Sequence, residues 1–525
     1  MDTGPSIYNE LNKAWRSTCK VLFGDELGEL KEFEDWVSEY SPEVKKKSSH
    51  ISGKEVALVV DEYCPTAKFI SADELKETSA PLDINDIKDI DSIMSAVSEQ
   101  MEYCGNRILG NSSTVTSSDI VIDSHYVYDS INIQECSRVM SSFMIRSAKH
   151  MFGSAFSGLC EFMVKSLVNI NANRCVDSHF ISNGSDIYFS YRCVGCSDLL
   201  FTFNQNNKRH MIGNLQLPKD RYLQLKKKIL GEIADELKRK KTFPSLFSLV
   251  PNERTEIDME IAATTPLEVN IEPIEKAFSA TAEIVLKKEL RGIQQYEPWL
   301  MRHALKPKEV TSRFGSKIYL PVGFGFSEYT ALLPDKELVS QNEADALGAL
   351  HLSEKSVGGL NSIRENIGNI AYFCPDASHG INRNAIESPC IDTASNVYKA
   401  YGATYSEHIG AMSLPIESSY LFGGYRNVKS KFCINCYVSL YLNRCFEVDT
   451  STKCSDTYFA HNCEGLQEAM FCFNTKGKRY AIGNAQLPPE QYKKIKSMLL
   501  GQISDEIVKT KSLRYDVFNI GCGKQ

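Results

Sequence analysis

The stretch that decides the fold is CYVSLYLNRCFEVDTSTKCSDTYFAHNCEGLQEAMFC, residues 436–472. Its five cysteines stand nine residues apart, and short β-prone runs separate them. Small residues keep the same interval earlier in the chain, at Cys175, Gly184, Cys193 and Thr202. This spacing predicts a β-solenoid with turns of about 18 residues, each made of two nine-residue halves. An antiparallel β-sandwich with fortuitous spacing is the alternative.

The sequence is written twice along the chain. Residues 127–241 align with residues 397–511 at a constant offset of 270, and 19 of 41 positions are identical between 201–241 and 471–511. We therefore expect an α+β protein of two tandem homologous halves. Each half is predicted to contain an N-terminal helical block, a short β-solenoid or sandwich-like block, and a C-terminal hairpin followed by a capping helix. The halves are expected to pack side by side with pseudo-twofold symmetry, as a fused dimer would.

The predicted boundaries follow the repeat. The chain divides into a helical region, a β-solenoid with its cap helix, a linker, a second helical and loop region, and a second β-solenoid with its cap helix: 1–120, 121–241, 242–272, 273–390 and 391–525. Apolar residues at helical spacing predict the first cap helix, and they are Tyr222, Leu225, Ile229, Ile233 and Leu237. The phrases Phe203-Asn204 and Ile212-Gly213-Asn214 predict two strands around a polar turn.

Composition narrows the class of protein. The chain has 525 residues, a net charge of −7 and 42% hydrophobic residues, which is typical of a globular protein and unlike one that coats nucleic acid. We expect neither a secretion signal nor a membrane span. The 17 cysteines are then expected to be reduced thiols, in the cytoplasm or in a particle assembled there.

The run from Cys193-x-x-Cys196 through Phe203-Asn204, Lys208-Arg209, Ile212 and Tyr222 resembles a cysteine-rich, internally duplicated family. That family is associated with uncultivated archaea, candidate-phylum bacteria and tailed phages, and it has no established activity. The resemblance implies two solenoid-type blocks, each ending in a segment like 201–241. It also implies a link to virus particles.

Two cysteine pairs have the spacing of zinc half-sites: Cys193 with Cys196, and Cys433 with Cys436. Neither pair is kept in the other half, because Cys196 corresponds to Leu466. We therefore predict no cofactor, with zinc as the alternative. The other interpretation is that cysteine serves as a small residue inside a narrow solenoid.

Basic residues could bind an acidic partner or a phosphate backbone. Both halves keep a Lys-Arg pair beside the polar turn, and the first cap helix adds a basic face; the candidates are Lys208, Arg209, Lys478, Arg479, Lys238 and Arg239. The alternative is an ordinary solvated helix face.

No catalytic signature is found. His461 and Cys463 are neighbours, but the first half has Tyr191 and Cys193 there. We predict a non-enzymatic structural or assembly protein, as a subunit of a virus particle or of another assembly, with other protein subunits or copies of itself as partners. Two alternatives stay open. One is a binding module for nucleic acid or ribonucleoprotein, and the other is a solenoid-groove enzyme acting on polysaccharide, which would use carboxylates such as Asp186 and Asp456.

Overall fold

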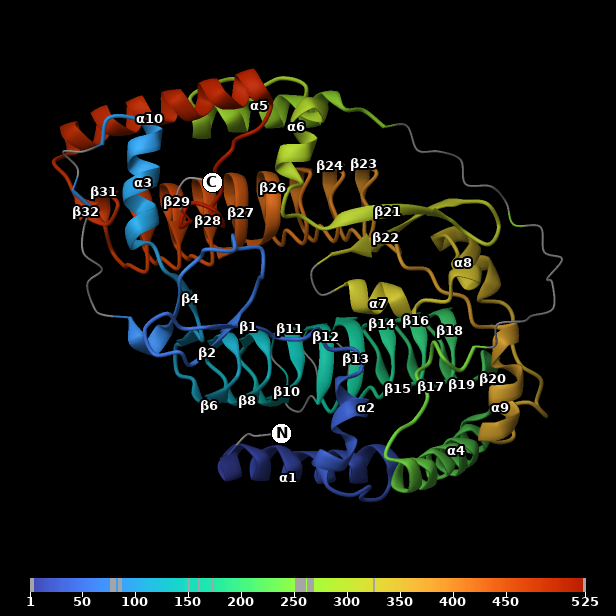
Figure 1. Ribbon diagram of the computed structural model, residues 1–525. Coiled ribbons are helices and arrows are strands. Elements are labelled where there is room, and N and C mark those ends of the chain that lie inside the picture. Colours follow the sequence, from blue (N-terminus) through green and yellow to red (C-terminus); the bar gives the residue numbers. More distant parts are fainter. Residues whose placement is uncertain are drawn as a thin grey trace.

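The computed structural model describes residues 4–75, 82–83, 87–146, 148, 152–158, 161–170, 174–250, 261, 269–323 and 326–522. The protein is a mixed α and β structure, with 28% helix and 32% strand. Figure 1 shows two stacks of short strands that face each other, with most of the helices on their outer sides. Among the described helices, none combines the length and apolarity needed to cross a bilayer.

The first stack runs from residue 108 to residue 216. Its strands lie on two sides, and each coiled strand pairs in parallel with the matching strand of the next coil, as Val121 does with Ile133. The strands are β5 (Ile108–Leu109), β6 (Ser113–Thr116), β7 (Asp119–Ile122), β8 (His125–Tyr128), β9 (Ile131–Gln134), β10 (Ser137–Met140), β11 (Ser142–Arg146), β12 (Gly153–Gly158), β13 (Lys165–Ile170), β14 (His179–Ser182), β15 (Ser185–Tyr188), β16 (Tyr191–Val194), β17 (Ser197–Leu200), β18 (Phe203–Asn206), β19 (Arg209–Ile212) and β20 (Leu215–Gln216).

The second stack runs from residue 383 to residue 486 and has the same register from coil to coil, as Cys433 and Cys445 show. Its strands form one ten-stranded sheet. They are β23 (Arg383–Ile386), β24 (Ser395–Tyr398), β25 (Glu407–Gly410), β26 (Ser419–Val428), β27 (Lys431–Leu440), β28 (Asn443–Asp449), β29 (Ser455–His461), β30 (Gln467–Phe473), β31 (Arg479–Ile482) and β32 (Ala485–Gln486).

The interior of a stack is filled by every third residue. In the second stack these are buried residues such as Cys436, Ser439, Leu442, Cys445 and Val448. The residue before each of them has a left-handed φ of 44° to 58°, and these residues are Asn435, Val438, Tyr441, Arg444 and Glu447. One left-handed residue in three turns the chain so that four side chains per coil point inward.

This geometry corrects the expected repeat, because a coil is shorter than the predicted turn. Residues that bond from one coil to the next, such as Ser439 with Ser451, are 12 residues apart in the sequence. The parallel strand partners keep this separation throughout the second stack. A coil of 12 residues has four inward positions, and nine residues span three of them. Each successive cysteine therefore lies on the next coil, one inward position earlier than the cysteine before it. All five cysteines lie in one buried core: Cys436, Cys445, Cys454, Cys463 and Cys472.

Serine joins one coil to the next. Ser439 Oγ donates to the carbonyl of Tyr437 at 2.7 Å and accepts the backbone N–H of Ser451 at 3.2 Å. Ser451 Oγ repeats this pattern toward Asp449 and Cys463. A hydroxyl at an inward turn position therefore satisfies backbone groups that the short strands leave unpaired.

The predicted hairpin is placed differently. β18 and β19 pair with β16 and β17, so they are successive sides of one coil and not partners. The antiparallel pair is β19 with β20, around Gly213 and Asn214, and β31 with β32 repeats it. The helices α4 (Lys219–Lys240) and α10 (Pro489–Thr510) follow. The predicted stripe of α4 is buried, which confirms that helix.

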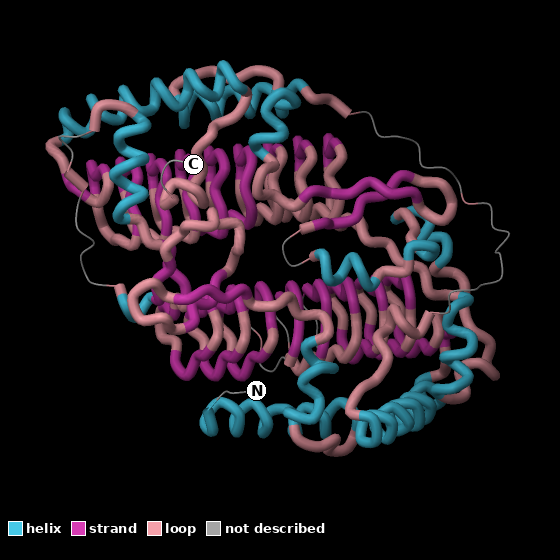
Figure 2. The backbone as a smooth tube through the Cα atoms, in the orientation of Figure 1, coloured by secondary structure: helices cyan, strands magenta, loops and turns pink. Residues whose placement is uncertain are grey.

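Helices cover the outer side of each stack (Figure 2). α1 (Gly4–Phe23), η1 (Leu30–Phe33) and α2 (Glu34–Ser38) lie on the first stack together with α4. α5 (Glu272–Leu286) and α6 (Ile293–Leu300) lie on the second stack with α10. Trp36 and Trp299 are 3% and 1% exposed, so each is anchored in a core.

Each half sends a long excursion to the other stack. The first contains β1 (Lys45–Ser48), β2 (Glu55–Leu58), β3 (Phe69–Ser71), η2 (Ala72–Glu74), α3 (Ile90–Gln100) and β4 (Tyr103–Gly105). α3 stands beside α10 in Figure 1, and its apolar face joins the core of the second stack. Strands therefore occupy part of the segment 1–120, which was expected to be helical, and the first coil already begins at Ile108.

The second excursion packs on the first stack. It contains β21 (Lys306–Thr311), β22 (Lys317–Val322), α7 (Ser327–Leu332), η4 (Asp335–Glu337), α8 (Gln341–Leu347), α9 (Leu360–Asn366) and η5 (Ile367–Asn369). Its apolar residues share a core with the end of the first stack and with α4. The segment 273–390, expected to hold helices and loops, therefore also contains the strands β21 and β22. Of the predicted linker 242–272, Phe243, Leu246 and Phe247 are buried, and residues 251–260 and 262–268 lie outside the described residues.

Corresponding hydrogen bonds hold the two excursions. Leu82 N donates to Gly483 O at 3.0 Å, and Leu352 N donates to Gly213 O at 2.8 Å. Asn474 Nδ2 donates to Glu102 O at 2.8 Å, and Asn204 Nδ2 donates to Tyr372 O at 3.0 Å. In both sets of hydrogen bonds, each residue of the first half lies 270 positions before the corresponding residue of the second half, which is the offset of the aligned halves.

The two stacks also meet in a shared apolar core. It joins residues of the first stack, such as Phe143, to Tyr425, Tyr437 and Phe518. A disulfide between Cys64 and Cys522 ties the first excursion to the end of the chain, and no disulfide joins the described cysteines inside the stacks. The Cys64–Cys522 pair departs from the expectation of reduced thiols.

Candidate functional site

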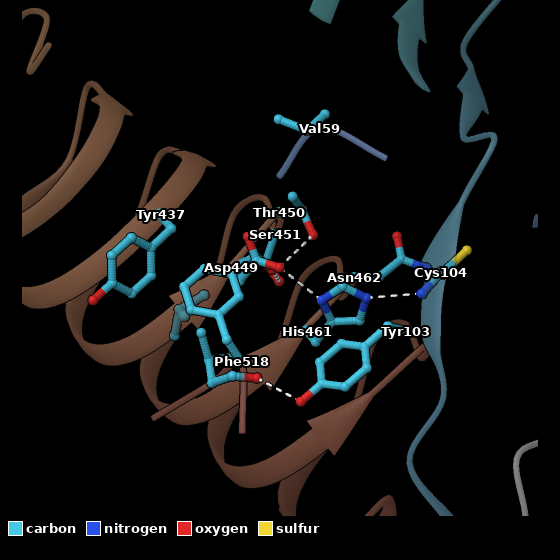
Figure 3. A network of polar contacts seen from close by, with 12 residues as sticks. Val59, Tyr103, Cys104, Tyr437, Asp449, Thr450, Ser451, His461, Asn462 and Phe518 are labelled. Carbon is cyan, nitrogen blue, oxygen red and sulfur yellow. Dashed lines mark hydrogen bonds and ion pairs between the residues drawn. The ribbon is translucent and has the colours of Figure 1, made fainter. Parts of the chain in front are cut away.

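A buried His–Asp pair lies where the first excursion meets the second stack (Figure 3). Asp449 ends β28 and His461 ends β29, and the parallel register places them side by side. His461 Nδ1 lies 2.7 Å from Asp449 Oδ2, and both side chains have 0% exposure. His461 Nε2 accepts the backbone N–H of Cys104 at 3.0 Å. Because Nε2 accepts, Nδ1 carries the ring proton and donates it to the carboxylate.

Among the described residues, Cys104 and Tyr103 lie beside this pair. Burial raises the pKa of the Cys104 thiol to about 12, so the thiol stays protonated. The Tyr103 ring lies 5.2 Å from the imidazole, and its hydroxyl donates to Val517 O at 3.0 Å. Both ring nitrogens of His461 are therefore occupied, and the arrangement works as a joint between β4, the second stack and the chain end.

A second cluster seats the chain end beside this joint. Glu447 Oε2 accepts the backbone N–H of Val517 at 3.1 Å, and Glu447 Oε1 accepts from Asn435 Nδ2 at 3.0 Å. Burial, with the charge of Asp516, raises the pKa of Glu447 to about 8. Asp516 itself accepts from Arg302 Nη1 at 2.8 Å.

His303 joins the same cluster. Its Nε2 lies 3.2 Å from Asp516 Oδ2, and its Nδ1 contacts the Glu62 carboxylate. Burial alone would lower the pKa of His303, but the hydrogen bonds to Asp516 and Glu62 outweigh it and raise the pKa to about 9. The imidazolium therefore links the first excursion, through Glu62, to the chain end.

The first stack has a corresponding cluster around Asp177. This buried carboxylate accepts from Tyr40 Oη at 2.6 Å and from Leu246 N at 3.2 Å, and it lies 2.8 Å from His179 Nε2. Burial would raise the pKa of Asp177, but the charge of Lys165 and the contact with His179 lower it. Asp177 and Glu447 occupy equivalent positions in the two aligned halves, and each holds the segment that follows a cap helix.

Lys165 is a fully buried cation with several partners. Its Nζ lies 3.6 Å from Asp177 Oδ2 and contacts the Glu39 carboxylate. The same nitrogen lies 4.6 Å from the ring centroid of Tyr40 and 5.4 Å from that of Trp36. A buried ammonium group is tolerated because both carboxylates and two ring faces compensate its charge.

The predicted zinc half-sites lie inside the stacks. Cys433 and Cys436 are adjacent inward residues whose thiols donate to the carbonyls of Lys431 and Ile434. Cys193 and Cys196 make the same kind of bond, to Tyr191 and Val194. The described residues contain no group of three or more His, Cys, Asp or Glu side chains placed to hold a metal ion. A hydrogen bond from Cys193 lowers the pKa of Cys196 to about 7.

The predicted basic residues are dispersed. Lys208 and Arg209 are exposed at the downstream end of the first stack, whereas Arg479 is exposed at that of the second, beside Lys478. Figure 1 places β19 and β31, which begin at Arg209 and Arg479, at opposite ends of the molecule. Lys238 pairs with Asp25 at 2.5 Å, and Arg239 lines a groove of about 800 Å³ between α4 and residues 355–362. The structure thus does not gather them into one surface.

The candidate catalytic residues are not gathered either. The Cys463 thiol points inward and donates to His461 O at 3.3 Å, and burial raises its pKa. Asp456 pairs with Arg444 at 2.7 Å, and Asp186 lies 3.4 Å from Arg174 Nη1. Each arginine lies one coil before its partner, so these pairs join neighbouring coils.

No protein-family model, curated protein or solved structure matches this chain. No sequence pattern marks Asp449, Glu447, His303 or Cys104 as members of these clusters. The correct coil length would have placed Asp449 beside His461, because these residues are one coil apart. No sequence signal indicates that residues 102–104 would reach across to the other half.

Proposed function

We propose that this chain is a non-enzymatic structural subunit of a macromolecular assembly, built from two tandem copies of one β-solenoid unit. A virus particle assembled in the cytoplasm is the case that the sequence resemblance implies. The observation that carries the proposal is the reciprocal exchange of excursions. Gly483 holds Leu82 and Gly213 holds Leu352, through the same backbone contact in each half.

Such an exchange is what a symmetric dimer with swapped segments would retain after its two chains were fused. It braces each stack with a segment of the other half, and the Cys64–Cys522 disulfide adds a covalent tie. A rigid unit with many contacts between its halves suits a structural role, because it deforms little under load from adjacent subunits. The titratable clusters support this role, since Asp449, Glu447 and Asp177 all hold backbone or side chains of other segments.

Fractionation of the native source on a density gradient tests the proposal. We expect the chain in a fast-sedimenting fraction, at a constant ratio to other subunits, and unchanged by nuclease treatment. Recovery only as a free chain of 58.9 kDa would overturn the proposal. Release by nuclease or by salt would support the nucleic-acid-binding alternative instead, and cleavage of a polysaccharide panel would support the enzyme.

A further inference from the structure

Three of the four stack ends are closed or protected. The downstream ends finish in the antiparallel pairs β19–β20 and β31–β32, each followed by a helix. At the upstream end of the second stack, Asn270 and Asn384 exchange two hydrogen bonds of 2.8 Å. That end also carries two charged residues and a proline within one coil, which are features that discourage strand addition: Arg383, Glu387 and Pro389.

At the upstream end of the first stack, Asn106 makes a comparable pair of hydrogen bonds with Ala57 and Glu55, so the difference lies in the sheet of β6. β6 is the outer strand of its sheet, and no strand in the described part of the chain pairs with its free side. Residues 108–118, ILGNSSTVTSS, contain no charge and no proline, although 24% of the whole chain is charged. Ile108 and Leu109 form β5, the end strand of the other sheet, and they are 47% and 37% exposed, whereas natural proteins usually protect such strand edges. A groove of about 570 Å³ lies between this edge and η2.

We propose that this edge is a self-association surface, on which β6 pairs antiparallel with β6 of a second copy across a twofold axis. The inference rests on the proposed structural role and names its first partner. An antiparallel strand pair is self-complementary, so one edge can serve both copies. Each chain has a net charge of −7, so two copies repel one another, but the edge 108–118 adds no like-charge contact of its own. Lys54, Glu55 and Asp73, which line the groove beside it, include both signs of charge. The other ends are protected, so the contact closes as a dimer and does not grow into a filament.

Light scattering on the purified full chain, across a concentration series, tests this inference. We expect a species of twice 58.9 kDa that dissociates on dilution. The double variant Ser113→Lys/Thr114→Lys places like charges on both sides of the proposed contact and is expected to be monomeric. Both residues are at least partly exposed, so the fold should tolerate the change. The matched control is Asn443→Lys/Gln467→Lys, which adds the same charge at exposed positions within the second stack and is expected to remain dimeric.

A wild-type chain that stays monomeric at its highest soluble concentration would overturn the inference, as would a lysine variant that still dimerises. Hydrogen exchange gives a second readout that needs no variant, because the amides of 113–116 should become more protected as concentration rises. The two proposals fail separately. A monomer found in the particle fraction contradicts only the dimer, whereas a dimer absent from every particle fraction contradicts only the assembly role.

Discussion

At the residue scale, position decides what the titratable groups of this protein do. Asp449 and His461 would be read as a catalytic dyad if they faced a cavity. Here the first excursion covers them, and Cys104 N–H occupies the second ring nitrogen. The first half has Tyr191 where the second has His461, and Tyr191 also reaches across, donating its hydroxyl to Cys374 O at 3.0 Å. Two different side chains thus perform the same structural task at equivalent positions.

Removing one member of the buried pair should cost more than removing both. His461→Leu leaves the Asp449 carboxylate buried without its partner, and we expect a loss of about 3 to 5 kcal/mol in the free energy of unfolding. The double variant Asp449→Leu/His461→Leu removes the uncompensated charge and is expected to recover part of that loss. Chemical denaturation followed by circular dichroism measures both. The pair would be shown to contribute nothing as a joint if His461→Leu were as stable as the exposed control His351→Leu.

The Glu447–His303 cluster makes stability depend on pH. The pKa of His303 rises from 6.5 to about 9, so its contribution is complete below pH 6.5 and is lost as pH rises through 9. The pKa of Glu447 rises from 4.5 to about 8, so its contribution is complete below pH 4.5 and is lost as pH rises through 8. Both groups therefore make the protein less stable as pH rises. Asp516 has the opposite effect, because its pKa is lowered: its contribution to stability is lost as pH falls, and only in acid.

We therefore expect the free energy of unfolding to fall by about 3 to 5 kcal/mol between pH 6.5 and 9. Thermal melts at several pH values measure this change. His303→Gln keeps a polar side chain but cannot titrate, so its profile should be flatter over that range. An identical slope in the variant would assign the pH dependence to other groups.

At the scale of elements, the cysteines show how far the sequence predicts the fold. Regular spacing of Cys436, Cys445 and Cys454 correctly predicts that they share one interior. It gives the wrong coil length, because nine and eighteen are multiples of the inward step of three but not of the coil. The deciding feature is a left-handed residue at every third position, and most of these residues are neither glycine nor asparagine. Their left-handed conformation depends on the stacking of neighbouring coils, and a local sequence pattern does not predict it.

Stack thiols should resist alkylation in the folded protein. Burial raises the pKa of Cys454 to about 12 and also that of Cys445, and both thiols are hydrogen-bonded to carbonyls. A brief iodoacetamide pulse at pH 8, read by mass spectrometry, should leave them unlabelled until denaturant is added. Cys196, whose pKa is lowered to about 7, is the internal comparison and should react first among the stack cysteines. Uniform labelling under native conditions would contradict the packed interior.

At the scale of the whole molecule, the aligned repeat predicts two like halves but not how they are joined. Residues 45–105 and 306–369 lie in the poorly aligned part of each half. Their apolar residues do not indicate whether they pack on the stack of their own half or on that of the other half. The partners become evident only from contacts such as those of Leu82 with Gly483 and of Leu352 with Gly213. An exchange of this kind is invisible to local sequence patterns, because the two packings bury the same residues.

The exchange predicts that two distant glycines are equivalent in energy. Gly213 and Gly483 have φ of +57° and +54°, and a Cβ at either position would overlap the leucine of the other half's excursion. Gly465 and Gly477 have φ of +66° and +61° but nothing near that position. Alanine should therefore cost about 1 to 2 kcal/mol at all four sites for the left-handed backbone. It should cost a further 1 to 3 kcal/mol, roughly, at Gly213 and Gly483 for the displaced leucine. Denaturant titrations of the four variants separate the two terms, and equal losses at all four sites would mean that the leucines are not seated there.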